Sequence, residues 1–356
     1  LDICYYQMPK IVTEKDINEI LSIQKLLFQN GLTNDLVHEY VIIKNLNDKL
    51  IGVVGRYYNN IRCLAVDPEY QGYNLSNALI SYIIKRIYQD NFNEIFVFTK
   101  PVNFAIFKYL GFRMIYCNEE FGFLTNRYDC FEEYLSYLSD LRKNNIKSNF
   151  KNISAIVMNA NPFTKGHQYL VETASNNSDL VYIIMVKEDV SLFSYKQRKE
   201  MVKLFTENIK NVFIVEGSNY LVSRNVFPSY FLSSPEKVIR SQIILDTHIF
   251  KNYIARNLGI KKRYVGEEPF SPTTNLYNVI MQEILVKSEI ELVVCPRLMW
   301  DFKPISATQV RKLFITGNFK DMKNLVPTTT LKFLQKLNYK KYAQDPKLSK
   351  LIDKSF

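Results

Sequence analysis

The main candidate site follows the apolar run 153–158, where residues 159–167 read Asn-Ala-Asn-Pro-Phe-Thr-Lys-Gly-His. This order predicts a strand, a proline-containing turn and a helix that begins near Thr164. Free backbone N–H groups and the positive end of the helix dipole favour anion binding at such a helix start. The Thr164 hydroxyl and the His167 imidazole are suited to donate to phosphate oxygens, and Gly166 permits close approach of a ligand. For this motif alone, the alternative is a capping threonine beside a solvent-facing histidine.

A second predicted helix start carries similar chemistry. Residues 305–311 read Ile-Ser-Ala-Thr-Gln-Val-Arg and follow the expected strand 291–294. Ser306 and Thr308 then stand at the helix N-terminus, and Arg311 lies one turn further in. Two hydroxyls and a permanently charged guanidinium suit a triphosphate. A capped helix with a surface arginine is the alternative for this stretch alone.

Other polar residues are weaker candidates. Glu188 and Asp189 follow the apolar run 180–186 and could contact a metal-bound triphosphate. Paired carboxylates after a strand are, however, commonly solvated loop residues. Arg198 and Arg224 could contact phosphates, while a surface ion pair is the simpler expectation for either residue alone.

The elements expected around both motifs alternate between strands and helices. In the second half, strands are expected at 153–158, 180–186, 212–215, 263–265 and 291–294, and helices at 166–174, 195–206, 235–258, 276–286 and 307–315. Near-continuous apolar strands separated by helices predict a mostly parallel, doubly wound sheet that is covered on both faces. In the first half, strands are expected at 50–57, 61–66 and 95–99, helices at 76–88 and 102–110, and turns at Asn59-Asn60 and Gly111.

Length and composition set the frame for these elements. A chain of 356 residues predicts two domains. We expect an N-terminal α/β domain at 1–128, a helical and basic linker at 129–151, a second α/β domain at 152–330 and a basic tail at 331–356. With 47% hydrophobic and 23% charged residues, the chain has the composition of a soluble globular protein.

Charge and the rarer residue types narrow the class of protein. The net charge of +11 should attract anionic partners, but it does not choose among nucleotides, nucleic acid, acidic proteins and membranes. Five cysteines without a C-x-x-C pair indicate a reducing cytoplasm. Three histidines without an H-x-x-H pattern predict no protein-built metal site. The longest apolar run is far shorter than the roughly 20 residues of a membrane span, and the start does not resemble a signal peptide.

Together, the two motifs resemble the signatures of the nucleotidyltransferase superfamily of the class I aminoacyl-tRNA synthetase type, whose first motif is usually H-x-G-H. Thr164 stands where the first histidine would be. Three further stretches resemble the citrate lyase ligases, a branch that carries threonine there: Val186 to Phe193 with Arg198 and Met201, Asn225 to Phe231, and Val265 to Phe270. The resemblance covers about residues 152–330 and implies a Rossmann-like domain.

The first half resembles the N-terminal domain of the same family, which has the GCN5-related N-acetyltransferase fold. Residues 66–76 (V-D-P-E-Y-Q-G-Y-N-L-S) match the strand-to-helix loop whose backbone N–H groups grip the pyrophosphate of coenzyme A, and residues 108–112 match a later element. A coenzyme-A-like thiol arm is therefore expected against Gln71, Gly72, Asn74 and Ser76. Asn74 replaces a usual glycine, and asparagine tolerates left-handed geometry better than other side chains.

The resemblance implies an AMP-forming acetate:citrate lyase ligase. ATP and acetate would give acetyl-adenylate and pyrophosphate, and the thiol of a coenzyme-A-like prosthetic group on the acyl carrier subunit of citrate lyase would displace AMP. Magnesium would accompany the nucleotide, the carrier would be acidic, and neither nucleic acid nor a membrane is an expected partner. The alternatives are an adenylyltransferase that makes a dinucleotide, of the pantetheine phosphate or nicotinamide mononucleotide type, and a non-catalytic regulatory protein that binds nucleotides or coenzyme A.

The implied reaction assigns roles to the two motifs. Thr164 and His167 would donate to the α- and β-phosphates, and Arg311 would help to hold the leaving pyrophosphate. The remaining contacts with ATP are expected from Asn161, Phe163, Gly166, Ser306, Thr308 and Arg198.

Overall fold

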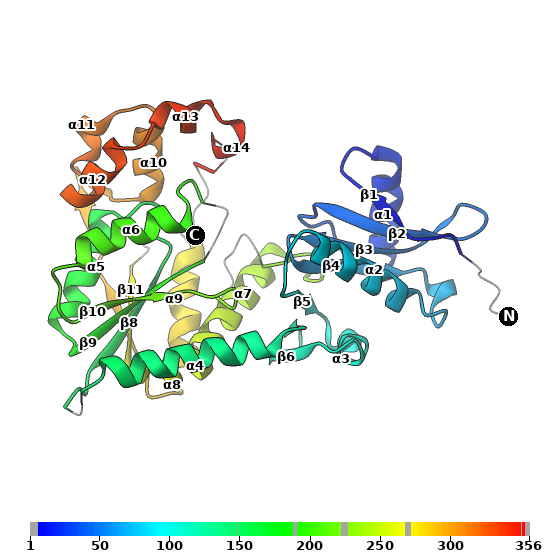
Figure 1. The fold of residues 1–356 in the computed structure, drawn as a ribbon, viewed down its shortest axis with the longest axis horizontal. Helices are drawn as coiled ribbons and strands as arrows, with labels where there is room; N and C mark the ends of the chain where they lie inside the picture. Colours follow the sequence, from blue (N-terminus) through cyan, green and yellow to red (C-terminus); the bar gives the residue numbers. More distant parts are fainter. Residues whose placement is uncertain are drawn as a thin grey trace. The chain divides into compact units, whose positions relative to one another are not determined.

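A computed structural model describes residues 6–147, 149–187, 191–221, 227–267, 272–349 and 351–352. The chain divides into two compact units, which Figure 1 draws as a ribbon. The first unit comprises Leu1–Glu133 and Phe227–Val238, and the second comprises Tyr134–Val226 and Ile239–Phe356. Two helices, α4 (Tyr128–Asn145) and α7 (Pro235–Ile249), carry the chain across two of the three boundaries between the units. Helix α4 thus extends well into the segment that the sequence analysis assigns to a helical linker.

The first unit is built on a seven-stranded sheet with the order β1-β2-β3-β4-β5-β7-β6. Its strands are β1 (Lys10–Val12), β2 (Glu39–Lys44), β3 (Leu50–Tyr57), β4 (Asn60–Val66), β5 (Phe96–Thr99), β6 (Arg113–Cys117) and β7 (Gly122–Thr125). Its helical segments are α1 (Ile17–Gln29), η1 (Pro68–Tyr70), α2 (Leu75–Gln89), η2 (Pro101–Asn103) and α3 (Phe104–Tyr109). The predicted hairpin of β3 and β4 is present, and its turn lies one residue earlier than expected because Tyr57 pairs with Asn60.

Helix α2 covers this sheet with one apolar face. Leu79, Ile80, Ile83 and Ile87 recur at helical spacing, and all four side chains are fully buried. They belong to one core cluster with residues of β2 to β5. This packing fixes the start of α2 just beyond the end of β4, so that the loop at 71–74 has a defined position.

The β4–β5 pair is the one parallel contact among the described strands of this sheet, and it is short. β4 and β5 pair only at Asn60 with Phe96 and at Ile61 with Val97. Further along, the register of β4 against β3 shifts, and Cys63 adopts a left-handed φ of 54°. The two strands therefore part beyond Ile61, and the backbone groups on their facing edges need other partners.

A segment from the second half of the chain supplies such a partner. The Tyr230 hydroxyl donates to the backbone carbonyl of Phe98 in β5 at 2.7 Å. The backbone N–H of Ser229 donates to Asp35 Oδ2 at 2.8 Å, and Phe227 packs edge to face on Phe98. Residues 227–238 are thus part of the first unit, although they lie inside the stretch that the sequence analysis assigns to the second domain.

The second unit contains a five-stranded sheet with the order β10-β9-β8-β11-β12, in which every neighbouring pair is parallel. Its strands are β8 (Ile153–Met158), β9 (Leu180–Met185), β10 (Val212–Glu216), β11 (Lys262–Gly266) and β12 (Glu291–Cys295). Its helices up to the second motif are α5 (Lys165–Asn176), α6 (Tyr195–Thr206), α7, η3 (Phe250–Ala255), α8 (Arg256–Leu258), α9 (Pro272–Leu285) and α10 (Ala307–Ile315). Because β8 lies in the middle and later strands are added on both sides, the predicted doubly wound sheet is confirmed.

The C-terminal residues extend the second unit. A two-stranded ribbon, β13 (Met299–Trp300) and β14 (Lys303–Pro304), precedes α10. The helices α11 (Phe319–Met322), α12 (Thr328–Gln335), α13 (Tyr339–Gln344) and α14 (Pro346–Ser349) follow and gather with α10 in Figure 1. Leu334 is fully buried, and the Tyr342 ring lies 5.2 Å from that of Phe314. Part of the expected basic tail therefore packs on the core of this unit.

Candidate active site

A cavity of about 460 Å³ lies in the second unit at the carboxyl ends of β8, β11 and β12. The strand order reverses between β8 and β11, which is where open α/β sheets usually bind ligands. The N-terminal turns of α5 and α10 form part of the wall. Both predicted phosphate-binding motifs therefore line one cavity, through Asn161, Thr164, Gly166, His167, Ser306, Thr308 and Arg311.

Thr164 and His167 form a reciprocal cap at the start of α5. The Thr164 hydroxyl accepts a hydrogen bond from the His167 backbone N–H at 3.4 Å, and the Thr164 backbone N–H donates to His167 Nδ1 at 3.0 Å. Histidine thus takes the place that glutamate or glutamine has in the usual capping box. The capping function expected for this motif as the plain alternative is therefore present, and the same two side chains also line the cavity.

The His167 ring is neutral near pH 7. Burial, together with the positive charge of Arg297, lowers the pKa of His167 to about 4. Because Nδ1 accepts from the Thr164 backbone, the ring proton resides on Nε2. Nε2–H is therefore the donor that this side chain can offer to a ligand in the cavity.

Arg311 connects the two motifs. Its Nη1 donates to the backbone carbonyl of Asn161 at 2.7 Å, its Nη2 to Thr308 Oγ1 at 2.9 Å, and its Nε to the carbonyl of Ile352 at 2.7 Å. Ser306 caps the same helix by accepting from the Gln309 backbone. Arg311 thus fixes the loop before α5 against the start of α10 and brings a positive charge to the cavity wall.

Two of the predicted contacts with ATP lie away from the cavity. Phe163 is fully buried between the rings of His167 and Phe205, at centroid distances of 5.6 and 5.1 Å. Arg198 is also fully buried and donates to three backbone carbonyl groups in the loops after β8 and β9. The side chains of these two residues therefore support the loops of the site and are not among the residues that line this cavity.

Arg297 is a site residue that the sequence analysis missed. It lies two residues beyond the end of β12 and lines the cavity, and its charge adds to the effect of burial in lowering the pKa of His167. Its Nη2 donates to the Ile305 carbonyl at 3.4 Å, directly before the second motif. A basic residue just after a predicted parallel strand is the signal that could have identified it.

Residues of β11, α7 and α9 form another part of the cavity wall, and its polar residues were also missed. Asp246 of α7 accepts hydrogen bonds through Oδ2 from Arg263 Nη2 at 3.1 Å and from the Tyr277 hydroxyl at 2.5 Å. Both Asp246 and Arg263 are buried, and all three residues line the cavity. The helical pattern of 235–258 gave no sign of this cluster, because a buried aspartate there reads as a polar interruption.

The loop expected to bind a coenzyme-A-like arm lies in the first unit and has left-handed geometry at two positions. Asn74 caps α2 with φ 60° and ψ 17°, and Gly72 has φ 92°. The Asn77 side chain donates to Asn74 Oδ1. Gln71, Gly72 and Asn74 are exposed, whereas Ser76 is half-buried. Asparagine therefore adopts here the conformation for which glycine is usual.

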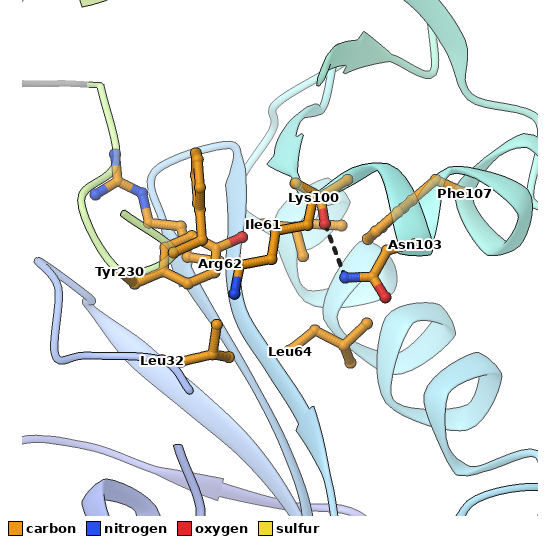
Figure 2. A pocket seen from close by; sticks show the side chains of 10 residues that line it. Leu32, Ile61, Arg62, Leu64, Lys100, Asn103, Phe107 and Tyr230 are labelled. Atoms are coloured by element: carbon orange, nitrogen blue, oxygen red, sulfur yellow. Dashed lines mark hydrogen bonds between the residues drawn. The ribbon is translucent and has the colours of Figure 1, made fainter. Parts of the chain in front are cut away.

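A second, much smaller cavity of about 20 Å³ lies in the first unit beside the gap between β4 and β5. Figure 2 shows Tyr230 and Leu32 on one side of it and Asn103 and Phe107 on the other. Burial raises the pKa of Tyr230, so its hydroxyl remains a neutral donor. A space of this size holds about one water molecule, and a longer ligand would need this gap to widen.

Several residues of the sequence argument lie outside the described residues: Glu188, Asp189, Arg224, Asn225, Val226 and 268–270. Among the described helices, none is both long and apolar enough to cross a membrane.

The parallel sheet and its two-motif cavity define a nucleotidyltransferase-type domain, which this chain combines with an acetyltransferase-like unit. A family model described as "Citrate lyase ligase C-terminal domain" matches residues 153–334, and one described as "Acetyltransferase (GNAT) domain" matches residues 24–124. The "[Citrate [pro-3S]-lyase] ligase" of Klebsiella pneumoniae is 35% identical over 321 residues, which cover 89% of this chain and 92% of that protein. The protein of the same name from Escherichia coli K12 is 32% identical, and the match covers 92% of this chain and 93% of that protein. The one from Haemophilus influenzae is 34% identical, and the match covers 93% of this chain and 98% of that protein.

The chain therefore belongs to the [citrate (pro-3S)-lyase] ligase family, and it is a ligase. This membership confirms the predicted family and the predicted combination of folds. It does not favour a dinucleotide-forming adenylyltransferase or a non-catalytic binding protein.

Proposed function

We propose that the protein activates acetate with ATP and transfers the acetyl group to a coenzyme-A-like thiol on the acyl carrier subunit of citrate lyase. One observation carries the nucleotide part of this proposal: two helix N-termini, each with hydroxyl and basic side chains, converge on one cavity. Membership of the ligase family supports the overall reaction. The route has two steps because an acetate oxygen is a poor leaving group and must first be activated.

In the first step, a carboxylate oxygen of acetate attacks the α-phosphorus of ATP. The bond between this phosphorus and the bridging oxygen of pyrophosphate breaks, and acetyl-adenylate and pyrophosphate form. No covalent bond to the protein is needed, so the protein contributes by positioning the reactants and stabilising charge. His167 Nε2–H is the proposed donor to the phosphates, with Arg297 supplying positive charge. The Thr164 hydroxyl lies 2.8 Å from the unprotonated His167 Nδ1 and donates to it, so Thr164 orients the imidazole.

The second motif is proposed to hold the leaving pyrophosphate. Ser306 and Thr308 stand at the start of α10, whose dipole favours an anion. Arg311 contributes charge and, through its bond to the Asn161 carbonyl, the relative position of the two motifs. Gly166 leaves room for the nucleotide, because a Cβ there would meet only Thr164 Oγ1, at 3.5 Å.

Magnesium enters this proposal as the counter-ion of the nucleotide. The described residues contain no group of three or more His, Cys, Asp or Glu side chains that could hold a metal ion. The phosphates would therefore supply most of its ligands, as is common for magnesium with nucleotides.

In the second step, the thiolate of the carrier attacks the acetyl carbon, and AMP leaves. We assign the arm that carries this thiol to the first unit, at the loop with Gln71, Gly72, Asn74 and Ser76. The net charge of +11 favours an acidic carrier subunit. Unpaired cysteines and a thiol substrate both fit a reducing cytoplasm.

The test is to mix the full-length protein with ATP, magnesium and acetate and to follow pyrophosphate together with the adenylate by mass spectrometry. Pyrophosphate release that depends on acetate, with acetyl-adenylate as the product, is the expected result. Addition of the thiol form of the carrier should then give AMP and the acetyl-thioester. Acetate-independent release, or a dinucleotide product, would contradict the proposal.

A further inference from the structure

Arg263, in the part of the cavity wall formed by β11, α7 and α9, has unused hydrogen-bonding capacity. Arg263 is only 2% exposed, and its guanidinium carbon lies 4.3 Å from the centre of the Phe250 ring. Nη2 donates to Asp246, but within the described part of the chain neither Nε nor Nη1 has a hydrogen-bond partner. The side chain nevertheless lines the cavity.

An enclosed guanidinium with unfilled donors is unfavourable. Burial removes the water that would otherwise accept from Nε and Nη1, and each donor left without a partner costs about 1–3 kcal/mol, or more for a charged group. Asp246 compensates part of this cost, and its Oδ2 is already shared with Tyr277. The arrangement therefore lacks an acceptor, and the adjoining cavity is the route by which one can arrive.

The position of Arg263 indicates which part of the substrates supplies that acceptor. The proposed phosphate site is formed by a different group of lining residues, in which Arg311 joins the starts of α5 and α10 and Arg297 acts on His167. Arg263 comes from β11 and stands with α7 and α9, where Ile239 adds an apolar surface. A charged donor beside a small apolar surface suits a short carboxylic acid, because arginine is the preferred partner of carboxylates.

We propose that Arg263 binds the carboxylate of the acid that is activated, with Asp246 and Tyr277 holding the guanidinium in place. This inference rests on the proposed function, since it names the acid subsite of the same cavity. It makes Arg263 a substrate-binding residue and Asp246 a positioning residue that competes for the same positive charge.

The experiment measures pyrophosphate release by the full-length protein, with acetate varied at saturating ATP and ATP varied at saturating acetate. Arg263→Lys keeps the charge and a partner for Asp246 but removes the two unused donors. We expect the KM for acetate to rise at least about tenfold, because this change corresponds to the binding free energy of one hydrogen bond. The KM for ATP should change less than twofold. Arg256→Lys, an exposed arginine on α8, is the matched control and should change neither constant.

A second variant tests the inference in the opposite direction and does not depend on the first one folding. Asp246→Asn removes the competing negative charge at nearly constant volume, so the KM for acetate should fall while that for ATP stays the same. A purely structural role of the pair would instead leave both constants unchanged or raise them together, and either result would overturn the inference. Absence of acetate-dependent release in the unmodified protein would be a different failure, that of the proposed function itself.

Discussion

His167 combines two tasks that usually belong to different residues. Its backbone N–H and Nδ1 complete the cap of α5 with Thr164, which leaves Nε2–H for the cavity. A cap holds a side chain in one place, so the donor is already oriented before a nucleotide binds.

The first prediction concerns this donor. His167→Ala should slow adenylate formation by about 10² or more, because one preoriented donor to developing charge contributes roughly 3 kcal/mol. Single-turnover measurement of acetyl-adenylate gives the rate, and His248→Ala, which lies outside the cavity, serves as the control. Near-normal adenylation by the His167 variant would refute the site assignment.

The second prediction concerns the stability of the protein against pH. The folded state binds a proton at His167 only near pH 4, whereas the unfolded chain does so near pH 6.5. Between these pH values the unfolded state holds more protons, so the free energy of unfolding decreases as the pH falls through this window. The full contribution of the neutral His167 to stability is present only above the window. Urea titrations at pH 7 and pH 5 measure this effect. Between these two pH values, the free energy of unfolding should decrease by roughly 2 kcal/mol more for the unmodified protein than for His167→Gln. Parallel losses in both proteins would contradict the neutral assignment.

The third prediction separates binding from folding at Gly166. In Gly166→Ala, the new methyl group would meet only Thr164 Oγ1 at 3.5 Å, so the fold accepts it, and alanine is the better helix former. We therefore expect an unchanged or higher melting temperature together with a KM for ATP raised about tenfold by the methyl group in the path of the ligand. Thermal denaturation and steady-state kinetics check the two parts. Unimpaired use of ATP would show that the nucleotide does not approach this turn.

At the scale of elements, the strongest sequence signals were accurate. The bounds expected for β8 and α10 agree with the structure, because β8 is an uninterrupted apolar run and α10 begins at a clear capping residue, Ser306. The edge strand β6 was not predicted, since its five residues carry little periodicity. Helix α1 was also missed, although it has 13 residues and buries Ile23, Leu26 and Leu27.

Contacts between distant segments were beyond a sequence argument. Phe163 and Arg198 were assigned to ATP because they lie in or near conspicuous motifs, yet the fold turns both into the interior. Arg263 was not predicted as a site residue, because it is a single charged residue in an expected strand and lies outside both motifs. Which polar residues face a cavity depends on packing between elements that are far apart in the chain, and local pattern does not encode it.

The loop before α2 carries the fourth prediction. In Asn74→Gly, the side chain is removed while the left-handed backbone is kept, so the fold of α2 should persist. Acetylation of the carrier thiol should change several-fold, whereas adenylate formation in the second unit should not. Asn91→Gly is the matched control, since Asn91 is also exposed and left-handed, with φ 63°. Equal effects on both half-reactions would show that the first unit does not bind the thiol arm.

For the whole molecule, the fifth prediction concerns a cut in the chain. Limited proteolysis should cleave between residues 142 and 151 and give fragments that start near residues 1 and 150. The fragments should nevertheless elute together in native buffer, because residues 227–238 of the C-terminal fragment are part of the first unit. Size-exclusion chromatography with and without urea provides the measurement and its control. Separation in native buffer would show that this segment is dispensable to the first unit.

The first unit includes residues 227–238, which are synthesised long after its other residues, and this order has a consequence for biosynthesis. When the ribosome has produced Glu133, the strands of the first unit are complete but Tyr230 does not yet exist, so the gap between β4 and β5 is unfilled. The chain must grow through Val226 before the missing piece emerges, which takes roughly 5–20 s at ordinary rates of translation. During that interval the aromatic surface around Phe98 and Phe121 is without its cover from Phe227. We therefore expect the first unit to reach its final packing only after residues 227–238 have emerged from the ribosome.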